Sequence, residues 1–207
     1  MSDFSTVPAE AKALDDSYVL GTYGRLPVEF VKGSGAVLTD SAGNDYLDFL
    51  GGIGCASLGH CHPAVVAAVR EQAEKLWQVG NYFYVENRGE AANGLSTLLS
   101  RITDESGHVT GSAAVTWKTF FANSGAEANE GAIKLARRWG EVKLDGAYGV
   151  ISAKKSFHGR TLATLAATGQ DKFHETFRPM PAGFASVDLN DIEALRAAVE
   201  NPAPECG

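Results

Sequence analysis

Hydrophobic and polar side chains alternate over two short stretches in the first quarter of the chain. Residues 36–40 read Ala-Val-Leu-Thr-Asp, residues 45–49 read Asp-Tyr-Leu-Asp-Phe, and Ser-Ala-Gly-Asn separates them. A spacing of two residues places alternate side chains on opposite faces of a strand, and a Gly-Asn pair favours a tight turn. The pattern therefore predicts a β-hairpin over residues 36–49.

Apolar residues recur at intervals of three and four over several longer segments, which is the spacing of one helix face. One such stripe begins after Pro63, a residue suited to the first turn of a helix, and continues to Trp77. Glycine tolerates the left-handed conformation that ends many helices, and an Asn with a Glu three residues later fits a capping box. On these grounds we predict two further helices over residues 9–14 and about 88–102. A third runs from Ala126 to Trp139 and ends at Gly140. A last helix is capped by Asn190, with Glu193 as the partner in the capping box, and ends at Asn201-Pro202.

Two apolar runs have the short length that is typical of buried strands. Val115–Phe121 leads toward the helix that begins at Ala126, and Tyr148–Ser152 follows that helix. A strand, a helix and a second strand in this order form a β-α-β unit, whose strands are parallel. The sequence therefore predicts an α/β fold with a parallel sheet.

Composition narrows the class of protein. The 207 residues contain 18 Lys and Arg against 25 Asp and Glu, a net charge of −7, which argues against binding to nucleic-acid phosphates. The longest apolar run is far shorter than the roughly 20 residues of a membrane span, and the first 20 residues lack the apolar core of a signal peptide. Cys55, Cys61 and Cys206 are not spaced as a disulfide framework. We therefore expect a cytoplasmic protein with no nucleic-acid or membrane partner.

One short cluster contains metal-ligand side chains, at His60, Cys61 and His62. Three consecutive residues do not readily close one tetrahedral site, and no other cluster of ligands accompanies them. We therefore predict no metal site, and we expect this loop to brace the start of the helix at Pro63.

The corner at Ser124-Gly125-Ala126 carries the most informative chemistry, because an apolar run passes through it into a helix whose first residues are small. The unpaired N–H groups and the positive dipole end of a helix attract anions, and small residues let a phosphate approach the backbone. The corner therefore indicates a phosphate site, with the hydroxyl of Ser124 as a further donor. Ordinary strand-to-helix corners also carry Ser-Gly and bind nothing, and this one matches neither a Walker loop nor a dinucleotide fingerprint.

A second loop, Lys154–Leu162, follows the next predicted strand, where an open α/β sheet presents ligand-binding residues. The ring of Phe157 is suited to stacking on a planar group, and the guanidinium of Arg160 is suited to clamping a carboxylate. The alternative is a packed phenylalanine and a surface ion pair. Together with the phosphate site, the loop favours a planar phosphorylated cofactor that meets an amino or keto acid.

These segments resemble the class III aminotransferases, which are pyridoxal-phosphate enzymes of fold type I. The resemblance covers nearly the whole chain, and its most specific parts are Asn123–Asn129 and Phe157–Gln170. It implies part of the large domain of that fold, a mostly parallel sheet with flanking helices, and an N-terminal segment with a small β-hairpin. The domains it implies are residues 1–60, which contribute to the small domain, and residues 61–207, the incomplete first part of the cofactor-binding large domain.

The resemblance also implies a cofactor site. The backbone at Gly125 and Ala126, with Ser124 nearby, would hold the phosphate of pyridoxal 5'-phosphate. Phe157 would stack on the pyridine ring, and His158 would support that loop. Glu127 and Asn129 also match the family, in positions that suit packing or capping.

The implied substrates are an amino acid and a keto acid. Arg160 would receive the α-carboxylate, Tyr23 would line the substrate side, and Asn81, Tyr82 and Phe83 would lie near the interface of a homodimer. Phe157–Gln170 is most similar to the members that act on acetylornithine, which implies transamination of N2-acetyl-L-ornithine with 2-oxoglutarate in arginine biosynthesis. Ornithine, succinylornithine and 4-aminobutyrate remain alternative amino donors, because Arg160 is shared by some of those enzymes.

The resemblance places no catalytic residue in this chain. A transaminase needs a lysine that forms a Schiff base and an acid beside the pyridine nitrogen. In the family both lie beyond the position of Gly207, so we expect the chain to correspond to the N-terminal half and to be inactive alone. Lys154 and Lys155 lack the family context, and we interpret them as a solvated pair at a strand end. A non-catalytic, truncated or interacting half is the alternative from another class.

Overall fold

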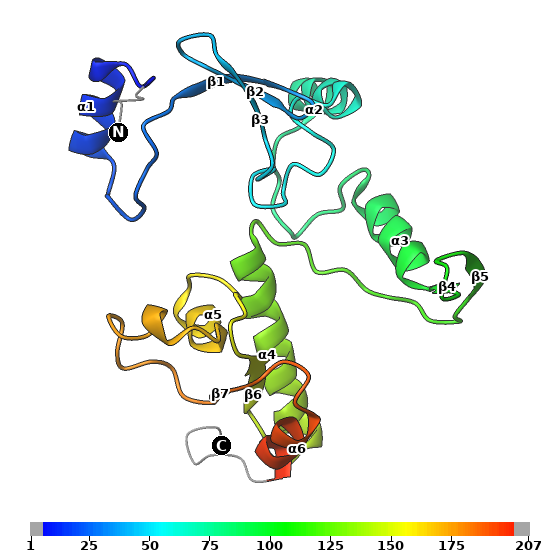
Figure 1. Cartoon of the computed structure of the whole chain (residues 1–207). Helices are drawn as coiled ribbons and strands as arrows, with labels where there is room; N and C mark the ends of the chain where they lie inside the picture. The colour runs from blue at the N-terminus through cyan, green and yellow to red at the C-terminus, as the bar shows by residue number, and fades with distance from the viewer. Residues whose placement is uncertain (1–5, 201–207) are drawn as a thin grey trace. The chain divides into compact units, whose positions relative to one another are not determined.

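The computed structural model describes residues 6–200, and the chain divides into two units, Met1–Tyr84 and Val85–Gly207. Each unit is described by itself. The first contains α1 (Ala9–Tyr18), β1 (Phe30–Ser34), β2 (Val37–Asp40), β3 (Asp45–Leu47) and α2 (Pro63–Lys75) (Figure 1). The second contains α3 (Arg88–Leu99), β4 (Arg101–Thr103), β5 (Val109–Ser112), α4 (Gly125–Lys143), β6 (Val150–Ala153), α5 (Leu162–Ala167), the 3₁₀ helix η1 (Asp171–Phe173), β7 (Phe184–Val187) and α6 (Ile192–Glu200). The predicted domains, 1–60 and 61–207, concern the architecture of a complete family member and stay a prediction.

The first unit contains the predicted hairpin. β2 and β3 pair antiparallel, with Leu38 opposite Tyr46, and β1 joins the free side of β2 to give the order β1-β2-β3. The sequence pattern did not predict β1, because Phe-Val-Lys-Gly-Ser places two apolar residues side by side instead of alternating them.

The turn of this hairpin is organised by Asp40, whose side chain is only 1% exposed. Its Oδ1 accepts the N–H groups of Ala42 and Asn44, and its Oδ2 accepts the amide of Asn44 and the hydroxyl of Tyr46, at 2.8–3.0 Å. Burial by itself raises the pKa of a carboxyl group, but the hydrogen bonds from Asn44 and Tyr46 outweigh it and lower the pKa of Asp40 from 3.8 to about 2. Both oxygens of the carboxylate are therefore occupied by the hairpin itself.

The helix predicted from Pro63 is confirmed as α2, although it ends at Lys75, before Trp77. The loop ahead of it is attached to the sheet through His60. The backbone of His60 exchanges two hydrogen bonds with Gly35, of 2.8 and 3.0 Å, and its Nε2 lies 2.6 Å from Oδ2 of Asp48. The His60 ring is therefore engaged with a carboxylate of the same unit, beside the start of α2.

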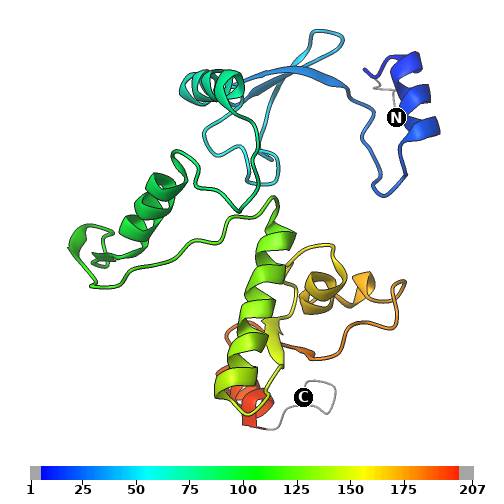
Figure 2. The same ribbon diagram turned by 180° about the vertical axis from the view of Figure 1, so that it is seen from behind.

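The second unit has parallel strands. β6 and β7 pair in parallel, with Val150 opposite Phe184 and Ala153 opposite Val187. The chain passes from β6 through α5 and η1 to β7, and α4 lies beside these elements in both views (Figures 1 and 2). The α/β class is confirmed, and the strand predicted over Tyr148–Ser152 is confirmed as β6, which runs from Val150 to Ala153. The sequence analysis did not predict β7.

The strand predicted over Val115–Phe121 is wrong, because the structure has irregular backbone there. A strand is maintained by hydrogen bonds to a neighbour, and within residues 6–200 no strand pairs with this segment. The ring of Phe120 instead packs against α4 at Gly131, where an added Cβ would lie 2.7 Å from the ring. An apolar run thus behaves as a strand only where a partner strand is available.

Two predicted helix ends are also wrong. The helix over 88–102 ends at Leu99 as α3, and Ile102 instead belongs to β4, paired antiparallel with Gly111 in β5. α4 continues through Gly140 to Lys143. A Cβ on Gly140 would lie 1.7 Å from the carbonyl oxygen of Ala147, so glycine serves close packing there and does not end the helix.

The start of α6 corrects the prediction that Asn190 caps the last helix. Oδ1 of Asp191 accepts the N–H of Ala194 at 2.8 Å, which makes Asp191 the capping residue. Asn190 has φ 66° and lies in the turn before it. The predicted helix end at Asn201-Pro202, and Cys206, lie outside the described residues.

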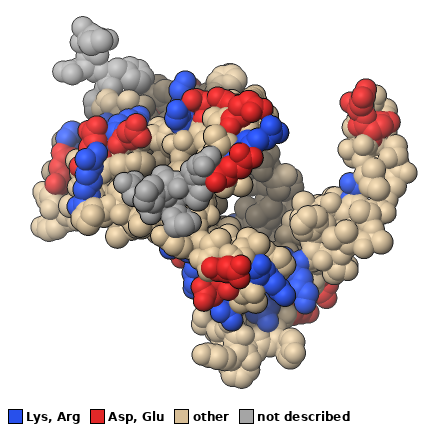
Figure 3. All heavy atoms as spheres, turned by 90° about the horizontal axis from the view of Figure 1, so that it is seen from below, with Lys and Arg blue, Asp and Glu red and all other residues tan. Residues whose placement is uncertain are grey.

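The surface offers two further observations. No helix within residues 6–200 combines the length and the apolar character that a membrane span requires. On the face shown in Figure 3, acidic and basic side chains are interspersed in small groups with uncharged surface between them.

Candidate functional site

The first turn of α4 is ordered by two side chains. The Oγ of Ser124 accepts the N–H of Glu127 at 3.1 Å, so Ser124 is the N-cap. The carboxylate of Glu127 in return accepts the backbone N–H and the side-chain amide of Asn123, at 2.7 and 2.9 Å. Glu127 therefore serves capping, which is one of the two roles expected for it.

The N–H groups of Gly125 and Ala126 remain available at this end of the helix. Neither has an acceptor within the described part of the chain, and a Cβ placed on Gly125 would meet no atom within 4 Å. Two free donors at the positive end of a helix, next to open space, form the kind of cradle that a phosphate group fills. These residues fit the phosphate of the cofactor that the sequence implies.

The Phe157–Arg160 loop packs directly on this cradle. Gly159 is buried and has φ 140°, and a Cβ there would lie 2.8 Å from the Cβ of Ala126 and 2.6 Å from the hydroxyl of Thr164. The amide of Asn129 donates to the carbonyl oxygen of His158 at 2.7 Å. The structure therefore brings together the two segments in which the sequence predicted a site, and Asn129 links them.

The same loop is held from α5 as well. Thr168 is fully buried, and its hydroxyl oxygen accepts the N–H of His158 at 3.0 Å while its own O–H donates to the carbonyl of Thr164 at 2.9 Å. The backbone of His158 is thus fixed on both sides, by Asn129 and by Thr168. The sequence analysis missed Thr168, although it lies in the Phe157–Gln170 run that carried the resemblance.

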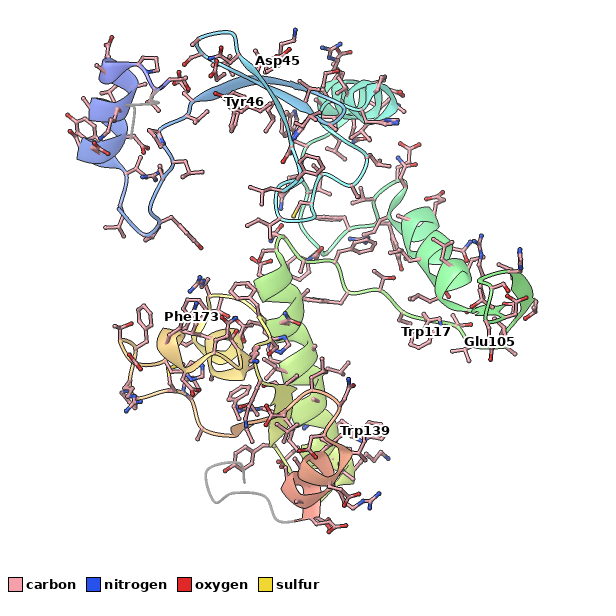
Figure 4. All side chains as sticks on the ribbon, in the orientation of Figure 1. Asp45, Tyr46, Glu105, Trp117, Trp139 and Phe173 are labelled. Atoms are coloured by element: carbon pink, nitrogen blue, oxygen red, sulfur yellow. The ribbon has the colours of Figure 1, made fainter. Side chains whose placement is uncertain are left out.

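Two aromatic rings flank the guanidinium of Arg160. Its Cζ lies 5.3 Å from the ring centre of Phe157 and 4.2 Å from that of Phe173. No acceptor within residues 6–200 receives a hydrogen bond from Arg160, so its donors are available to a ligand. Phe157 is 57% exposed, and its ring has accessible surface for a planar group. Phe173 in η1, which is labelled in Figure 4, was missed because an isolated Phe in an irregular segment has no pattern that marks it.

Lys154 lies at the carboxyl end of β6, the region in which open parallel sheets bind ligands. Its Nζ forms an ion pair with Oδ2 of Asp188, at 2.8 Å, just after β7. The hydrogen bond to Asp188 raises the pKa of Lys154 above its ordinary value. Because a Schiff-base lysine reacts through its neutral amine, this environment disfavours Lys154 in that role.

Tyr23 and the segment Asn81–Phe83 belong to the first unit. Tyr23 lines a cavity of about 530 Å³ together with α1 residues, and an ion pair of 2.9 Å between Arg25 and Asp15 lies in the same wall. Tyr82 is 98% exposed. The predicted roles of Tyr23 toward substrate and of Asn81–Phe83 at a subunit interface stay predictions. Within residues 6–200 no group of three or more His, Cys, Asp and Glu side chains is arranged to hold a metal ion.

Comparison with known protein families gives a match to the family described as Aminotransferase class-III, over residues 20–204. Among curated proteins, the acetylornithine aminotransferase of Caldanaerobacter subterraneus subsp. tengcongensis is 49% identical over 188 residues, which are 90% of this chain and 44% of the relative. The acetylornithine aminotransferase of Methanocaldococcus jannaschii is 46% identical over 187 residues, with 90% and 43% covered. The chain therefore spans less than half the length of these relatives.

Solved structures agree in fold. The ornithine aminotransferase from Toxoplasma gondii ME49 superposes with a TM-score of 0.79 at 31% identity, over 92% of this chain and 42% of that one. The acetylornithine aminotransferase from Elizabethkingia anophelis gives a TM-score of 0.67 at 29% identity, over 93% and 41%. The fold is therefore that of part of a fold type I aminotransferase.

Proposed function

The chain belongs to the class III aminotransferases, and we propose that the whole protein transfers the amino group of N2-acetyl-L-ornithine to 2-oxoglutarate, a step of arginine biosynthesis. One observation carries the proposal. The two free N–H groups at the start of α4 adjoin a loop with an exposed aromatic ring and an arginine whose donors have no acceptor among residues 6–200. An anion cradle, a stacking surface and a carboxylate clamp are what a pyridoxal-phosphate transaminase needs from this part of the fold.

The chain's own residues would hold the cofactor as follows. The N–H groups of Gly125 and Ala126 would donate to the phosphate, with Ser124 ordering the helix start, and Phe157 would offer its ring to the pyridine face. His158 would contribute through its backbone, whose hydrogen bonds to Asn129 and Thr168 hold the loop in place beside the start of α4. Bound pyridoxal phosphate supplies an aldehyde that accepts the amino group and a ring that withdraws electrons.

Arg160 would bind a substrate carboxylate in both halves of the reaction, first the α-carboxylate of acetylornithine and then a carboxylate of 2-oxoglutarate. A guanidinium matches a carboxylate with two parallel N–H donors, which fixes the orientation of the substrate as well as its position. Tyr23 would line the substrate side. We assign no lysine of residues 6–200 as the Schiff-base residue, and we place that residue in the portion of the relatives' length that this chain does not span.

The assembly and the setting of the reaction belong to the same proposal. We propose a homodimer in the cytoplasm, with Asn81, Tyr82 and Phe83 near the subunit interface, with amino and keto acids as substrates, and with no nucleic-acid or membrane partner.

The choice of acetylornithine over ornithine rests on the curated relatives, whose identities of 43–49% all accompany the acetylornithine name. The test is a comparison of kcat/KM for acetylornithine, ornithine, succinylornithine and 4-aminobutyrate, with 2-oxoglutarate as acceptor, in the whole protein. We expect the highest value for acetylornithine. Equal or higher values for ornithine would contradict the substrate while leaving the reaction class intact, and no glutamate from any donor would contradict the reaction class.

A further inference from the structure

We propose that Phe173 positions Arg160 for carboxylate binding, as a stacking surface that holds the guanidinium in place before a substrate arrives. The inference deepens the proposed function and rests on it, because it takes Arg160 as the carboxylate-binding residue. Phe173 does not contact the substrate in this proposal. It acts through Arg160 and is therefore a positioning residue.

The guanidinium of Arg160 lies over the ring of Phe173. A cation is attracted to the face of an aromatic ring within about 6 Å of its centre, and arginine is the cation most often found there. Of the two rings at Arg160, that of Phe173 is the nearer, at 4.2 Å against 5.3 Å for Phe157. Because the guanidinium is planar, a stacked arginine keeps its N–H donors at its edges, free for a carboxylate.

The short helix that carries Phe173 is anchored by hydrogen bonds. The N–H of Phe173 donates to the carbonyl of Gln170 at 3.0 Å, and the Gln170 side chain donates to the carbonyl of Ser156 at 2.9 Å. This ties η1 to the loop that carries Arg160. The next residue, His174, places its Nε2 2.8 Å from the carbonyl oxygen of Thr168, at the end of α5. The segment that carries the half-buried Phe173 is therefore tied both to the loop of Arg160 and to the end of α5.

Phe157 and Phe173 differ in what else their rings would contact. In the proposed function Phe157 offers its ring to the cofactor, so it serves two contacts. Phe173 has no such second ligand. Its ring attracts Arg160 and, at 4.8 Å, the ammonium of Lys172, which lies beside it in η1. Lys172 therefore provides a matched control, since its removal takes away a positive charge near the site but leaves the ring.

The expected kinetic signature follows from where the stack acts. Arg160 would hold the carboxylate in the ground state and in the transition state alike, so a looser Arg160 weakens both equally. Loss of the Phe173 ring should therefore raise KM for the amino donor and for 2-oxoglutarate by the same factor and leave kcat unchanged. A general loosening of the active site would instead lower kcat.

The experiment compares Phe173→Leu, Phe173→Tyr and Lys172→Gln in the whole protein loaded with pyridoxal phosphate. It measures KM and kcat for acetylornithine and 2-oxoglutarate, and it measures the Kd of glutarate by calorimetry, as a carboxylate that does not react. We expect Phe173→Leu to raise both KM values and the glutarate Kd about fivefold, the size of one exposed cation–π contact. Phe173→Tyr should retain wild-type values, because tyrosine also presents a ring face. Lys172→Gln should shift the glutarate Kd by less than Phe173→Leu does.

Three results would overturn the proposal: no change on Phe173→Leu, no rescue by Phe173→Tyr, or an equal effect of Lys172→Gln. Failure of the proposed function is seen separately, as an absence of transamination in the unmodified protein. Glutarate binding then still tests the contact between Phe173 and Arg160. The positioning role is supported if the wild-type protein binds glutarate, Arg160→Gln abolishes the binding and Phe173→Leu weakens it. Absence of glutarate binding to the wild-type protein would contradict it.

Discussion

Two arginines of the second unit lie over pairs of aromatic rings, and they differ in where their donors point. Arg137, on α4, lies 5.8 Å from the ring centre of Tyr148 and 5.2 Å from that of Phe184, and its Nη2 donates to the carbonyl of Ala182 at 2.9 Å. Arg160 has a similar pair of rings but no acceptor within residues 6–200. Contact with aromatic rings alone therefore does not distinguish a structural arginine from a ligand-binding one. The two are distinguished by whether the N–H groups of the arginine already donate to the protein.

The surroundings of the two side chains support this reading. The Nε of Arg137 is buried without an acceptor in the described residues, and a Cβ on Gly183 would lie 2.9 Å from its Nη2, so this guanidinium is enclosed between α4 and the segment that enters β7. Arg160 is exposed and lies next to the exposed ring of Phe157. Arg160 is therefore more accessible to a carboxylate than Arg137 is.

The largest expected effect comes from removing Arg160, the arginine that we propose binds the substrate carboxylate. Arg160→Gln should lower kcat/KM for acetylornithine on the order of 100-fold, because a charge-assisted hydrogen-bonded pair with the carboxylate is lost, worth up to about 3 kcal/mol. The melting temperature should stay within the scatter of the wild type. Steady-state kinetics and thermal unfolding of the whole protein check both parts. A loss of stability equal to that of an Arg137 variant would break the comparison.

Substitution of Arg137, the structural arginine, should lower stability and leave substrate binding unchanged. Arg137→Met should lower the free energy of unfolding by about 2 kcal/mol, the sum of one hydrogen bond and a cation–π contact. KM for 2-oxoglutarate should not change. Denaturant titration measures the first quantity and initial rates the second. A raised KM in a fully folded variant would show that Arg137 also serves the substrate.

A smaller effect is expected where the two segments of the site meet. Asn129→Ala removes the hydrogen bond from α4 to the carbonyl of His158, worth about 1 kcal/mol, and should weaken the binding of pyridoxal phosphate by a comparable factor of about fivefold. Lys134→Ala, an exposed change on the same helix, is the control. Cofactor titration by absorbance measures the effect, and equal affinities in the two variants would contradict the linking role of Asn129.

The smallest effect at neutral pH is expected at Asp40, whose two carboxylate oxygens both accept hydrogen bonds within the hairpin. Its pKa is lowered from 3.8 to about 2 in the folded chain, so its contribution to stability is present above about 4 and is lost as the pH falls toward 2. Asp40→Asn should flatten the stability profile over that interval, since asparagine does not titrate. Unfolding of both proteins at pH values from 2 to 5 measures the difference. Parallel profiles would show that Asp40 does not titrate as the hydrogen bonds imply.

Local patterns predicted the elements whose stability is local. The hairpin of β2 and β3 follows from alternation and a turn, and α2 follows from its apolar stripe and Pro63. Val115–Phe121 has an equally clear apolar pattern but no partner strand among the described residues, so the prediction of a strand there was wrong. The periodicity of a segment indicates which of its faces are apolar. Whether the segment forms a strand depends on a second strand that can pair with it.

The candidate site divides in the same way. An anion site at Ser124, Gly125 and Ala126 could be proposed from the sequence because it depends on adjacent residues, and that role stays a prediction. The capping by Ser124 was found only in the structure. Thr168 and Phe173 were missed because their roles depend on contacts with residues 10 and 13 positions earlier, at His158 and Arg160, which only the folded loop brings together. Asn129 was recognised as part of the motif, but its link to His158, 29 positions later, required the structure.

The most direct test of the central claim is a crystal structure of the whole protein with pyridoxal phosphate and 2-oxoglutarate. The account predicts the phosphate within hydrogen-bond distance of the N–H groups of Gly125 and Ala126, and a carboxylate of the keto acid on the guanidinium of Arg160. A phosphate held elsewhere, or a keto acid bound without Arg160, would contradict it.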